Sequence, residues 1–335
     1  MRACWAIRAT VLVLLSVAAA GLPGGLAAAE SVQGDGGKVR LLHSPSGTNS
    51  FPPFVIRKFG LDKKYGFELQ PVLQATTQTG ITAIQAGGAE LGTFGWNDIQ
   101  RMKNAGVKVI GIAPFLRWGA DFSLVPVNSS IRTLGDLKGK KYGVTSRHSL
   151  NYIVERAVAR KTYGFDLEKD ATIVEGAPSL LWGLAEQGQV DATQMFNSLV
   201  PAMITTGKFR VLAKVSDIIQ QFGLPDTPFL LYTVDANYAA ARPNNVKAFL
   251  AAYRDAIQIL QTDDAVWLER GKEMKMSEEA AALFRKEGRT DIWAKFAPDT
   301  EANIKKTFDA LLEAAGPAIL GIGELSPGFM TLEYQ

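Results

Sequence analysis

Side chains that can hold a small molecule follow the predicted β-strands of this 335-residue chain. They are hydroxyl, amide, aromatic and guanidinium groups, which bind by hydrogen bonds, ring contact and charge. The candidate binding residues are Ser46, Thr48, Asn49, Phe51, Thr77, Trp96, Asn97, Trp118, Ser146, Arg147, Ser149, Phe196 and Asn197. This set predicts a site that binds a ligand without covalent chemistry.

Arg147 is the strongest polar candidate. An arginine beside a helix N-terminus can fork onto a carboxylate or a sulfonate, although a solvated surface arginine looks the same in sequence. Trp96 and Trp118 follow predicted strands, and each forms either a wall for the ligand or part of the core. We predict that Trp96 supplies an apolar wall and Arg147 a charge partner, from opposite halves of the fold. Asn49 and Ser149 are also good helix N-cap residues, and capping alone would explain them.

The sequence contains few residue patterns that are typical of catalytic sites. The two histidines, His43 and His148, lack metal-binding spacing. The one cysteine, Cys4, lies near the N-terminus, and no HExxH, GxxxxGK[ST] or Gly-x-Ser-x-Gly pattern occurs. The pair Gly321 and Gly323 lacks the third glycine of a dinucleotide-binding loop. We therefore expect no enzymatic activity, no metal site and no cofactor.

Short apolar segments alternate with amphipathic ones, which predicts α/β structure with mainly parallel sheets. The predicted strands are residues 38–43, 67–73, 91–94, 107–113, 121–127, 141–145, 172–175, 190–195, 210–215 and 229–234. The predicted helices are residues 53–59, 79–86, 149–163, 179–187, 245–261 and 298–315. The pattern restarts after residue 128, so we predict two α/β lobes, each with a central mixed sheet, joined by crossover segments.

The order of these elements predicts how the chain is divided. Residues 30–128 and 223–335 form the first lobe, the latter segment giving a return strand and C-terminal helices, and residues 129–222 form the second lobe. In an open parallel sheet, ligands bind beyond the carboxyl ends of the strands, where loops lead into helix N-termini. The candidate residues follow such strand ends in both lobes, which predicts a binding cleft between them.

The first 29 residues resemble a cleavable signal peptide. Arg2 and Arg8 precede or flank an apolar run over residues 10–21, and Ala27 and Ala29 stand before Glu30 as a signal peptidase requires. A membrane span needs about 20 apolar residues, so the alternative of a retained anchor is less favoured. We predict cleavage before Glu30 and export to the periplasm. Cys4 precedes the apolar run and is therefore no lipoprotein cysteine.

The charge of the chain bears on its partners. Lysine and arginine total 36 against 33 acidic residues, a formal net charge of +3. A nucleic-acid-binding protein normally shows a strong basic excess or a basic run, and neither is present. We expect no nucleic-acid partner.

Three local phrases, in a fixed order, carry a family resemblance. Residues 84–92 (IQAGGAELG) combine a helix end, a glycine turn and an acidic residue before a strand. Residues 133–144 (TLGDLKGKKYGV) form a turn that leads into a strand, and residues 184–192 (LAEQGQVDA) repeat the helix, glycine turn and acidic residue. The chain thereby resembles the substrate-binding proteins of ABC importers in the nitrate, taurine, sulfonate and pyrimidine-precursor class.

That resemblance implies a type II periplasmic binding protein, acting as a monomer. It would close like a hinge on a small molecule, and importer membrane subunits would recognise the closed form. The aromatic residues favour a small organic ligand, with sulfonates and aromatic carboxylates as candidates. Two alternatives stay open: a pyrimidine-precursor binding protein or synthase of the thiamine pathway, and a ligand-sensing domain. The synthase branch carries a cysteine-rich motif that this chain lacks.

Overall fold

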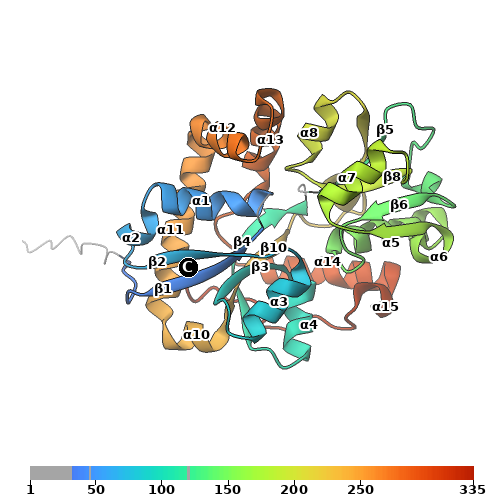
Figure 1. The fold of residues 1–335 in the computed structure, drawn as a ribbon. Helices are drawn as coiled ribbons and strands as arrows, with labels where there is room; N and C mark the ends of the chain where they lie inside the picture. The colour runs from blue at the N-terminus through green and yellow to red at the C-terminus, as the bar shows by residue number, and fades with distance from the viewer. Residues whose placement is uncertain (1–31, 45–46, 119–120) are drawn as a thin grey trace, which may run out of the picture. The chain divides into compact units, whose positions relative to one another are not determined.

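The computed structural model describes residues 32–44, 47–118 and 121–335. The predicted signal peptide and Ser46 lie outside these residues. The described residues form two five-stranded sheets with helices packed on both sides (Figure 1). This is the α/β fold of periplasmic binding proteins that the sequence predicts. No helix in the described part of the chain is long and apolar enough to cross a membrane.

The first sheet has the strand order β2-β1-β3-β10-β4. Its strands are β1 (Lys38–His43), β2 (Glu68–Leu73), β3 (Leu91–Gly95), β4 (Val109–Arg117) and β10 (Pro228–Asp235). Strand β1 pairs in parallel with β2 and β3, whereas β10 runs antiparallel between β3 and β4. The predicted return strand thus joins the first sheet.

The second sheet has the order β7-β6-β8-β5-β9. Its strands are β5 (Asp121–Pro126), β6 (Lys141–Val144), β7 (Thr172–Glu175), β8 (Ala192–Phe196) and β9 (Phe209–Lys214). Strand β5, which enters this sheet from the first one, runs antiparallel to β8 and β9. Each sheet is therefore mixed because one strand arrives by a crossover. The division at residues 128 and 222 stays a prediction, and the pairing of β5 favours a first boundary before Asp121.

Helices follow most strands and cover the sheets. They are α1 (Phe51–Lys58), α2 (Leu61–Lys64), α3 (Thr77–Gln85), α4 (Trp96–Asn104), α5 (Leu150–Tyr163), α6 (Leu167–Asp170), α7 (Pro178–Glu186), α8 (Val200–Thr205), α9 (Val215–Gln221), α10 (Ala236–Ala241), α11 (Pro243–Thr262), α12 (Asp264–Glu273), α13 (Glu278–Asp291), α14 (Thr300–Ala315) and α15 (Pro317–Leu320). Short 3-10 turns at Thr48–Ser50 (η1) and Leu134–Leu137 (η3) precede α1 and β6.

Helix α4 corrects one sequence-based expectation. Trp96 and Asn97 follow a predicted strand, in a position where loops are expected, but Gly95 is extended and Trp96 already begins the helix. No polar N-cap side chain marks this start, so the helix begins without the usual signal in its sequence. A Cβ on Gly95 would lie 2.5 Å from Oδ1 of Asn97, so a larger residue at this position would force the Asn97 side chain to move.

Candidate functional site

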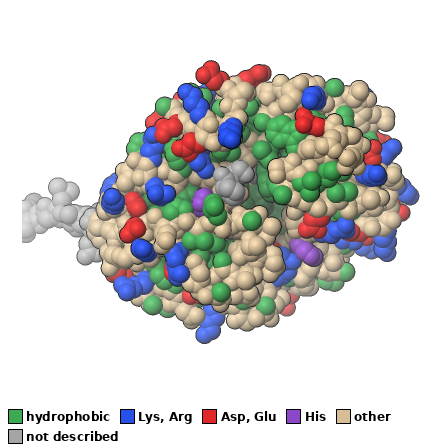
Figure 2. Space-filling model, in the orientation of Figure 1, with side chains coloured by type: hydrophobic (Ala, Val, Ile, Leu, Met, Phe, Trp, Pro, Cys, Tyr) green, Lys and Arg blue, Asp and Glu red, His purple; other side chains and the backbone are tan. Residues whose placement is uncertain are grey.

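Strand ends of both sheets meet at one place in the described structure. Figure 2 shows a hollow in the middle of the viewed face, with hydrophobic side chains on its walls. Thr48, just after β1, donates from Oγ1 to Oδ1 of Asn197, just after β8, over 2.8 Å. Asn97, just after β3, donates from Nδ2 to the backbone oxygen of His148 in the second half, over 3.3 Å. These contacts join residues that follow strands of the two different sheets.

Three buried asparagines in this region have fixed amide orientations. The NH2 group of Asn97 faces a carbonyl, that of Asn151 faces a carboxylate of Asp121, and that of Asn197 faces Asp291 over 3.3 Å. Carbonyl and carboxylate oxygens only accept hydrogen bonds, so each amide oxygen must point the other way. Thr48 satisfies the amide oxygen of Asn197. The amide oxygens of Asn97 and Asn151 have no partner among the described residues.

A face of the second sheet carries an outer rung of polar side chains. Asp121 begins β5, and its Oδ2 accepts a hydrogen bond from Asn151 in the first turn of α5. Both side chains are buried, at 2% and 3% exposure, yet Oδ1 of Asp121 also has no partner among the described residues. A buried acceptor without a donor costs about 1–3 kcal/mol, more if it is charged. Oδ1 of Asp121 in the outer rung can therefore accept a hydrogen bond from a ligand.

An inner rung lies one helical turn deeper. Four helix residues and two strand residues span nearly the same length, about 6 Å. Glu155 on α5 therefore lies level with Ser123 on β5, as Asn151 lies level with Asp121. Glu155 accepts hydrogen bonds from Ser123 on β5, from the Tyr142 hydroxyl over 2.5 Å and from Nε2 of Gln194 over 3.2 Å. The inner rung is thus largely satisfied by the protein itself.

The carboxyl groups of this region hold their protons unusually well. Burial raises the pKa of Glu155 to about 7 and the pKa of Asp291 to about 6. Burial, and then the charges of Glu155 and Asp291, raise the pKa of Asp121 well above its ordinary value. The charges of Glu155 and Asp291 disfavour ionisation of Asp121, and they would disfavour an anion bound next to it in the same way.

Trp96 and Trp118 are core residues. They are 0% and 1% exposed, and their rings meet edge to face at 6.4 Å. Trp96 also contacts Phe308, and Trp118 stacks on Phe229 at 5.5 Å. Nε1 of Trp118 donates to Thr227, whereas Nε1 of Trp96 has no partner among the described residues. The two rings pack beneath the strand ends, so the packing alternative explains their burial, and the wall role stays a prediction.

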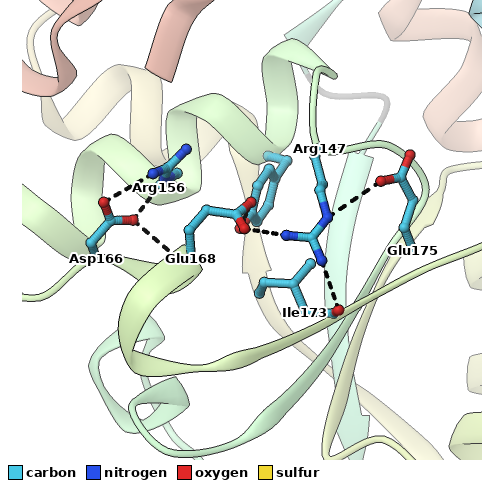
Figure 3. Close-up of polar contacts among 7 residues, drawn as sticks. Arg147, Arg156, Asp166, Glu168, Ile173 and Glu175 are labelled. Atoms are coloured by element: carbon cyan, nitrogen blue, oxygen red, sulfur yellow. Dashed lines mark hydrogen bonds and ion pairs between the residues drawn. The ribbon is translucent and has the colours of Figure 1, made fainter. Parts of the chain in front are cut away.

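Arg147 is engaged within its own sheet. Its guanidinium pairs with Glu168, donates to the backbone oxygen of Ile173 over 2.9 Å and lies 3.4 Å from Glu175 (Figure 3). Figure 3 shows the side chain pointing toward these acceptors, with the pair of Arg156 and Asp166 alongside. Two carboxylates already neutralise the charge of Arg147. The contacts favour a structural role and give no support to the expected anion anchor.

Replacing Arg147 with alanine is expected to lower the free energy of unfolding by about 1–2 kcal/mol, since a charged hydrogen bond and an ion pair are lost. Ligand affinity should stay unchanged. Urea unfolding and calorimetric titration measure the two quantities. Arg132→Ala, which removes an exposed arginine elsewhere in the same half, serves as the control. Loss of affinity with unchanged stability would restore the anion-anchor hypothesis.

The other predicted residues fall into three groups. Asn49 lies next to the site and has a buried Oδ1 without a partner among the described residues, while Phe196 is 37% exposed at the end of β8. Ser149 caps α5 by accepting from the amide of Tyr152, and Ser146 accepts from the amide of His148, so local hydrogen bonds explain both.

Phe51 and Thr77 are not part of the polar cluster, which consists of Thr48, Asn97, Asp121, Asn151, Asn197 and Asp291. Phe51 is 0% exposed and packs against Trp267 at 4.7 Å and Phe284 at 5.3 Å, which makes it a core residue. Thr77 is exposed at the start of α3, where the preceding Thr76 supplies the cap. Position after a strand suggested both residues, but packing decides what a side chain touches.

Sequence reasoning missed Asp121, Asn151, Ser198 and Asp291. A charged residue at the head of the apolar segment 121–127 was a usable signal for Asp121, because a buried carboxylate needs a reason. Ser198 is 1% exposed, and its Oγ has no partner among the residues that the structure describes. Asp291 ends a helix 94 residues beyond Asn197, and nothing in the sequence links the two.

A separate cavity of about 590 Å³ opens beside the polar cluster. Its lining residues are Trp182, Leu199, Ala202, Thr205, Thr206, Arg270, Glu273, Met274, Lys275, Met276, Ser277 and Glu279. None of these belongs to the two rungs. We place the site at the rungs because their buried acceptors, unlike the walls of the cavity, demand partners. The described residues contain no cluster of three side chains suited to a metal ion.

Solved structures of similar fold include two sulfonate-binding proteins. The alkanesulfonate-binding protein SsuA from Xanthomonas axonopodis pv. citri, bound to MOPS, is 19% identical, with coverage of 88% of this chain and 98% of that one and a TM-score of 0.72. The periplasmic aliphatic sulphonate-binding protein SsuA from Escherichia coli is 20% identical, with coverage of 82% and 87% and a TM-score of 0.68. At these identities the likeness shows the fold alone.

An enzyme shares the same fold. The desulfurization enzyme DSZB is 15% identical, with coverage of 89% of this chain and 97% of that one and a TM-score of 0.62. The fold therefore does not separate binding proteins from enzymes. A search of curated protein sequences gives no significant match.

The family follows from the sequence match. A family profile described as NMT1/THI5 like matches residues 48–264, which include η1, every strand of the two sheets except β1, and the polar cluster except Asp291. The resemblance of the three local phrases points the same way. The chain belongs to the NMT1/THI5 like family.

Proposed function

We propose that the protein is the solute-binding component of an ABC importer, which captures a small organic molecule where the strand ends of the two sheets meet. The observation that carries the proposal is the set of buried acceptors at that place, on Asn97, Asp121 and Asn151, which have no partner within the described part of the chain. The fold and the family support it. Export to the periplasm, a monomeric state, delivery to importer membrane subunits and the absence of a nucleic-acid partner are parts of the same proposal.

Contacts across the two sheets suggest how the site would close. Thr48 bonds to Asn197, which bonds to Asp291, so a chain of hydrogen bonds links residues following β1, β8 and α13. Breaking this chain would separate the strand ends and expose the outer rung. A ligand that bridges the two halves would favour the closed arrangement, because it adds contacts that only the closed form offers.

The proposal is tested by a ligand screen. Sulfonates, aromatic carboxylates, pyrimidines, amines and nitrate are added to the purified protein in a thermal-shift assay. A ligand at 100 times its Kd is expected to add about 2.7 kcal/mol to the free energy of unfolding. Small-angle scattering with that ligand should show no expansion, and Asn197→Ala should shift the ligand-free protein to larger dimensions. If no compound binds and native mass spectrometry finds no retained molecule, the proposal fails.

The predicted anionic ligands are the weaker choice. A sulfonate or carboxylate at the outer rung would face Asp121 and lie near Asp291, both acidic. Of the nearby cations, Arg117 pairs with Asp226, and Lys214 lies 3.0 Å from Glu287. A buried anion with no matching cation is strongly unfavourable.

A pyrimidine-precursor binding protein is the second candidate, because an aminopyrimidine offers N–H donors to the unpartnered acceptors. Mass analysis of aminopyrimidines after incubation with the protein distinguishes a binding protein from a synthase. An unchanged compound indicates binding, whereas a converted compound indicates a synthase. A ligand-sensing role is tested by the gene neighbourhood. Permease and ATPase genes next to the gene of this protein support the importer role, and their absence there supports the sensing role.

A further inference from the structure

Asp121 is a buried carboxyl group that the protein leaves without a cation. It is 2% exposed, and none of the ion pairs among the described residues includes it. The groups that influence it are the amide of Asn151 and the carboxyl groups of Glu155 and Asp291. Buried carboxylates are normally paired with a cation or bound to a metal ion. The described residues supply no paired cation for Asp121, so a bound ligand is the partner that would let it ionise.

Two further acceptors point to the same partner independently of charge. The amide oxygens of Asn97 and Asn151 are buried, with the residues 1% and 3% exposed, and neither has a partner in residues 32–44, 47–118 and 121–335. Their amide orientations are fixed by acceptors on the other side, so they cannot turn to offer N–H donors. A ligand group that carries several N–H donors and a positive charge supplies what each of these acceptors lacks among the described residues.

An exposed aromatic ring stands beside the outer rung. Phe196 pairs directly across from Asp121 in the β5–β8 ladder, and residues opposite each other in antiparallel strands have side chains on the same face. Phe196 is 37% exposed. An exposed apolar ring next to a buried polar group matches a ligand with one polar end and one apolar body.

Resting on the proposed solute-binding function, we propose that Asp121 is the specificity-determining residue of the site and selects a ligand with a positively charged nitrogen group, an ammonium or amidinium, on an apolar body. Asn151 and Asn97 take the remaining N–H donors. The apolar body lies against Phe196. The protein would then discriminate against sulfonates of the same shape by charge.

Four compounds with one ring and different polar ends test this directly. Benzamidine is cationic, benzamide is neutral, and benzoate and benzenesulfonate are anionic at pH 7.5. Calorimetric titration of the purified protein is expected to give at least a tenfold tighter Kd for benzamidine than for benzamide, with no detectable binding of the two anions. Tighter binding of either anion would overturn the inference and leave the solute-binding proposal standing.

Asp121→Asn separates the carboxylate from the shape of the site. We expect it to weaken benzamidine binding by a factor of at least 30 and to remove the preference over benzamide, since the amide side chain keeps the size but not the charge. Asp217→Asn, which changes an exposed carboxyl group on α9, should leave both Kd values unchanged. A preference for benzamidine that survives Asp121→Asn contradicts the assignment.

A measurement on the unaltered protein covers the case in which the variant does not fold. Binding of a cation ionises Asp121, whose carboxyl group faces Glu155, Asp291 and Asn151. Benzamidine should therefore release a proton to the buffer, and its binding heat should change with the ionisation enthalpy of the buffer, whereas benzamide should show no such change. Equal behaviour of the two compounds, or no binding of any of the four, overturns the inference. Failure of the wider ligand screen as well would remove the proposed function too.

Discussion

Replacing Trp96 with alanine is expected to lower the free energy of unfolding by about 3–5 kcal/mol, the usual effect of removing a buried aromatic side chain. Trp96 is 0% exposed and packs edge to face against Trp118 at 6.4 Å and Phe308 at 6.1 Å. Its removal loses apolar contact area and leaves a cavity between α4 and α14. Urea unfolding followed by circular dichroism measures the change.

Two comparisons make this result specific. Trp182→Ala, at a half-buried tryptophan on α7, should lower the free energy of unfolding by less than half as much. A double-mutant cycle of Trp96→Ala with Phe308→Leu should show coupling, because the two rings touch. The wall role predicted from sequence requires a different pattern. Unchanged stability with a ligand Kd raised tenfold or more would show that Trp96 faces the ligand and not the core.

The second large effect is a loss of stability with rising pH, caused by Glu155. Burial raises the pKa of Glu155 from its ordinary 4.5 to about 7 in the folded protein. Between these values the folded state binds more protons than the unfolded state, so the free energy of unfolding falls as pH rises. The shift corresponds to an upper value of roughly 3 kcal/mol between pH 4.5 and pH 8. Asp121 and Asp291, whose pKa values are also raised, act in the same direction.

Glu155→Gln tests this assignment. The variant keeps the shape of the side chain but cannot ionise, so its free energy of unfolding should depend less on pH between 4.5 and 8. Relative to the unaltered protein, it should gain stability at pH 8 and not at pH 4.5. Glu313→Gln, at an exposed position on α14, should leave the pH profile unchanged. An identical pH profile for Glu155→Gln and the unaltered protein would contradict the role of Glu155.

The strands were the most predictable part of the fold. Residues 38–43 and 172–175 match β1 and β7 at both ends, and the other predicted strands lie within a few residues of the observed ones. Short apolar runs bounded by turns report burial in a sheet directly. Helix α4 escaped prediction because Gly95 gives no polar cap, and its helical pattern starts without a break from β3.

The polar cluster was only partly predictable. Asn97 and Asn197 were chosen because they follow strands, and the structure brings both to the place where the sheets meet. Arg147 was chosen by the same rule, yet it turns toward Glu168 on α6, 21 residues away, because this carboxylate of its own half of the fold is a close partner. Chemical type and position after a strand predict which side chains can reach the site. They do not predict which partner each side chain binds.

The sequence by itself determined the α/β class, the strand positions and the absence of familiar catalytic patterns, because these depend on residue types and on periodicities within one segment. Only the tertiary structure decided which groups remain without partners. Asp121 and Asn151 meet because β5 and α5 keep step over one helical turn, and Asp291 reaches Asn197 from a distant helix. Charge neutralisation and hydrogen bonding act over a few ångströms in space, irrespective of separation along the chain. The character of the binding site therefore emerged from packing and not from any local motif.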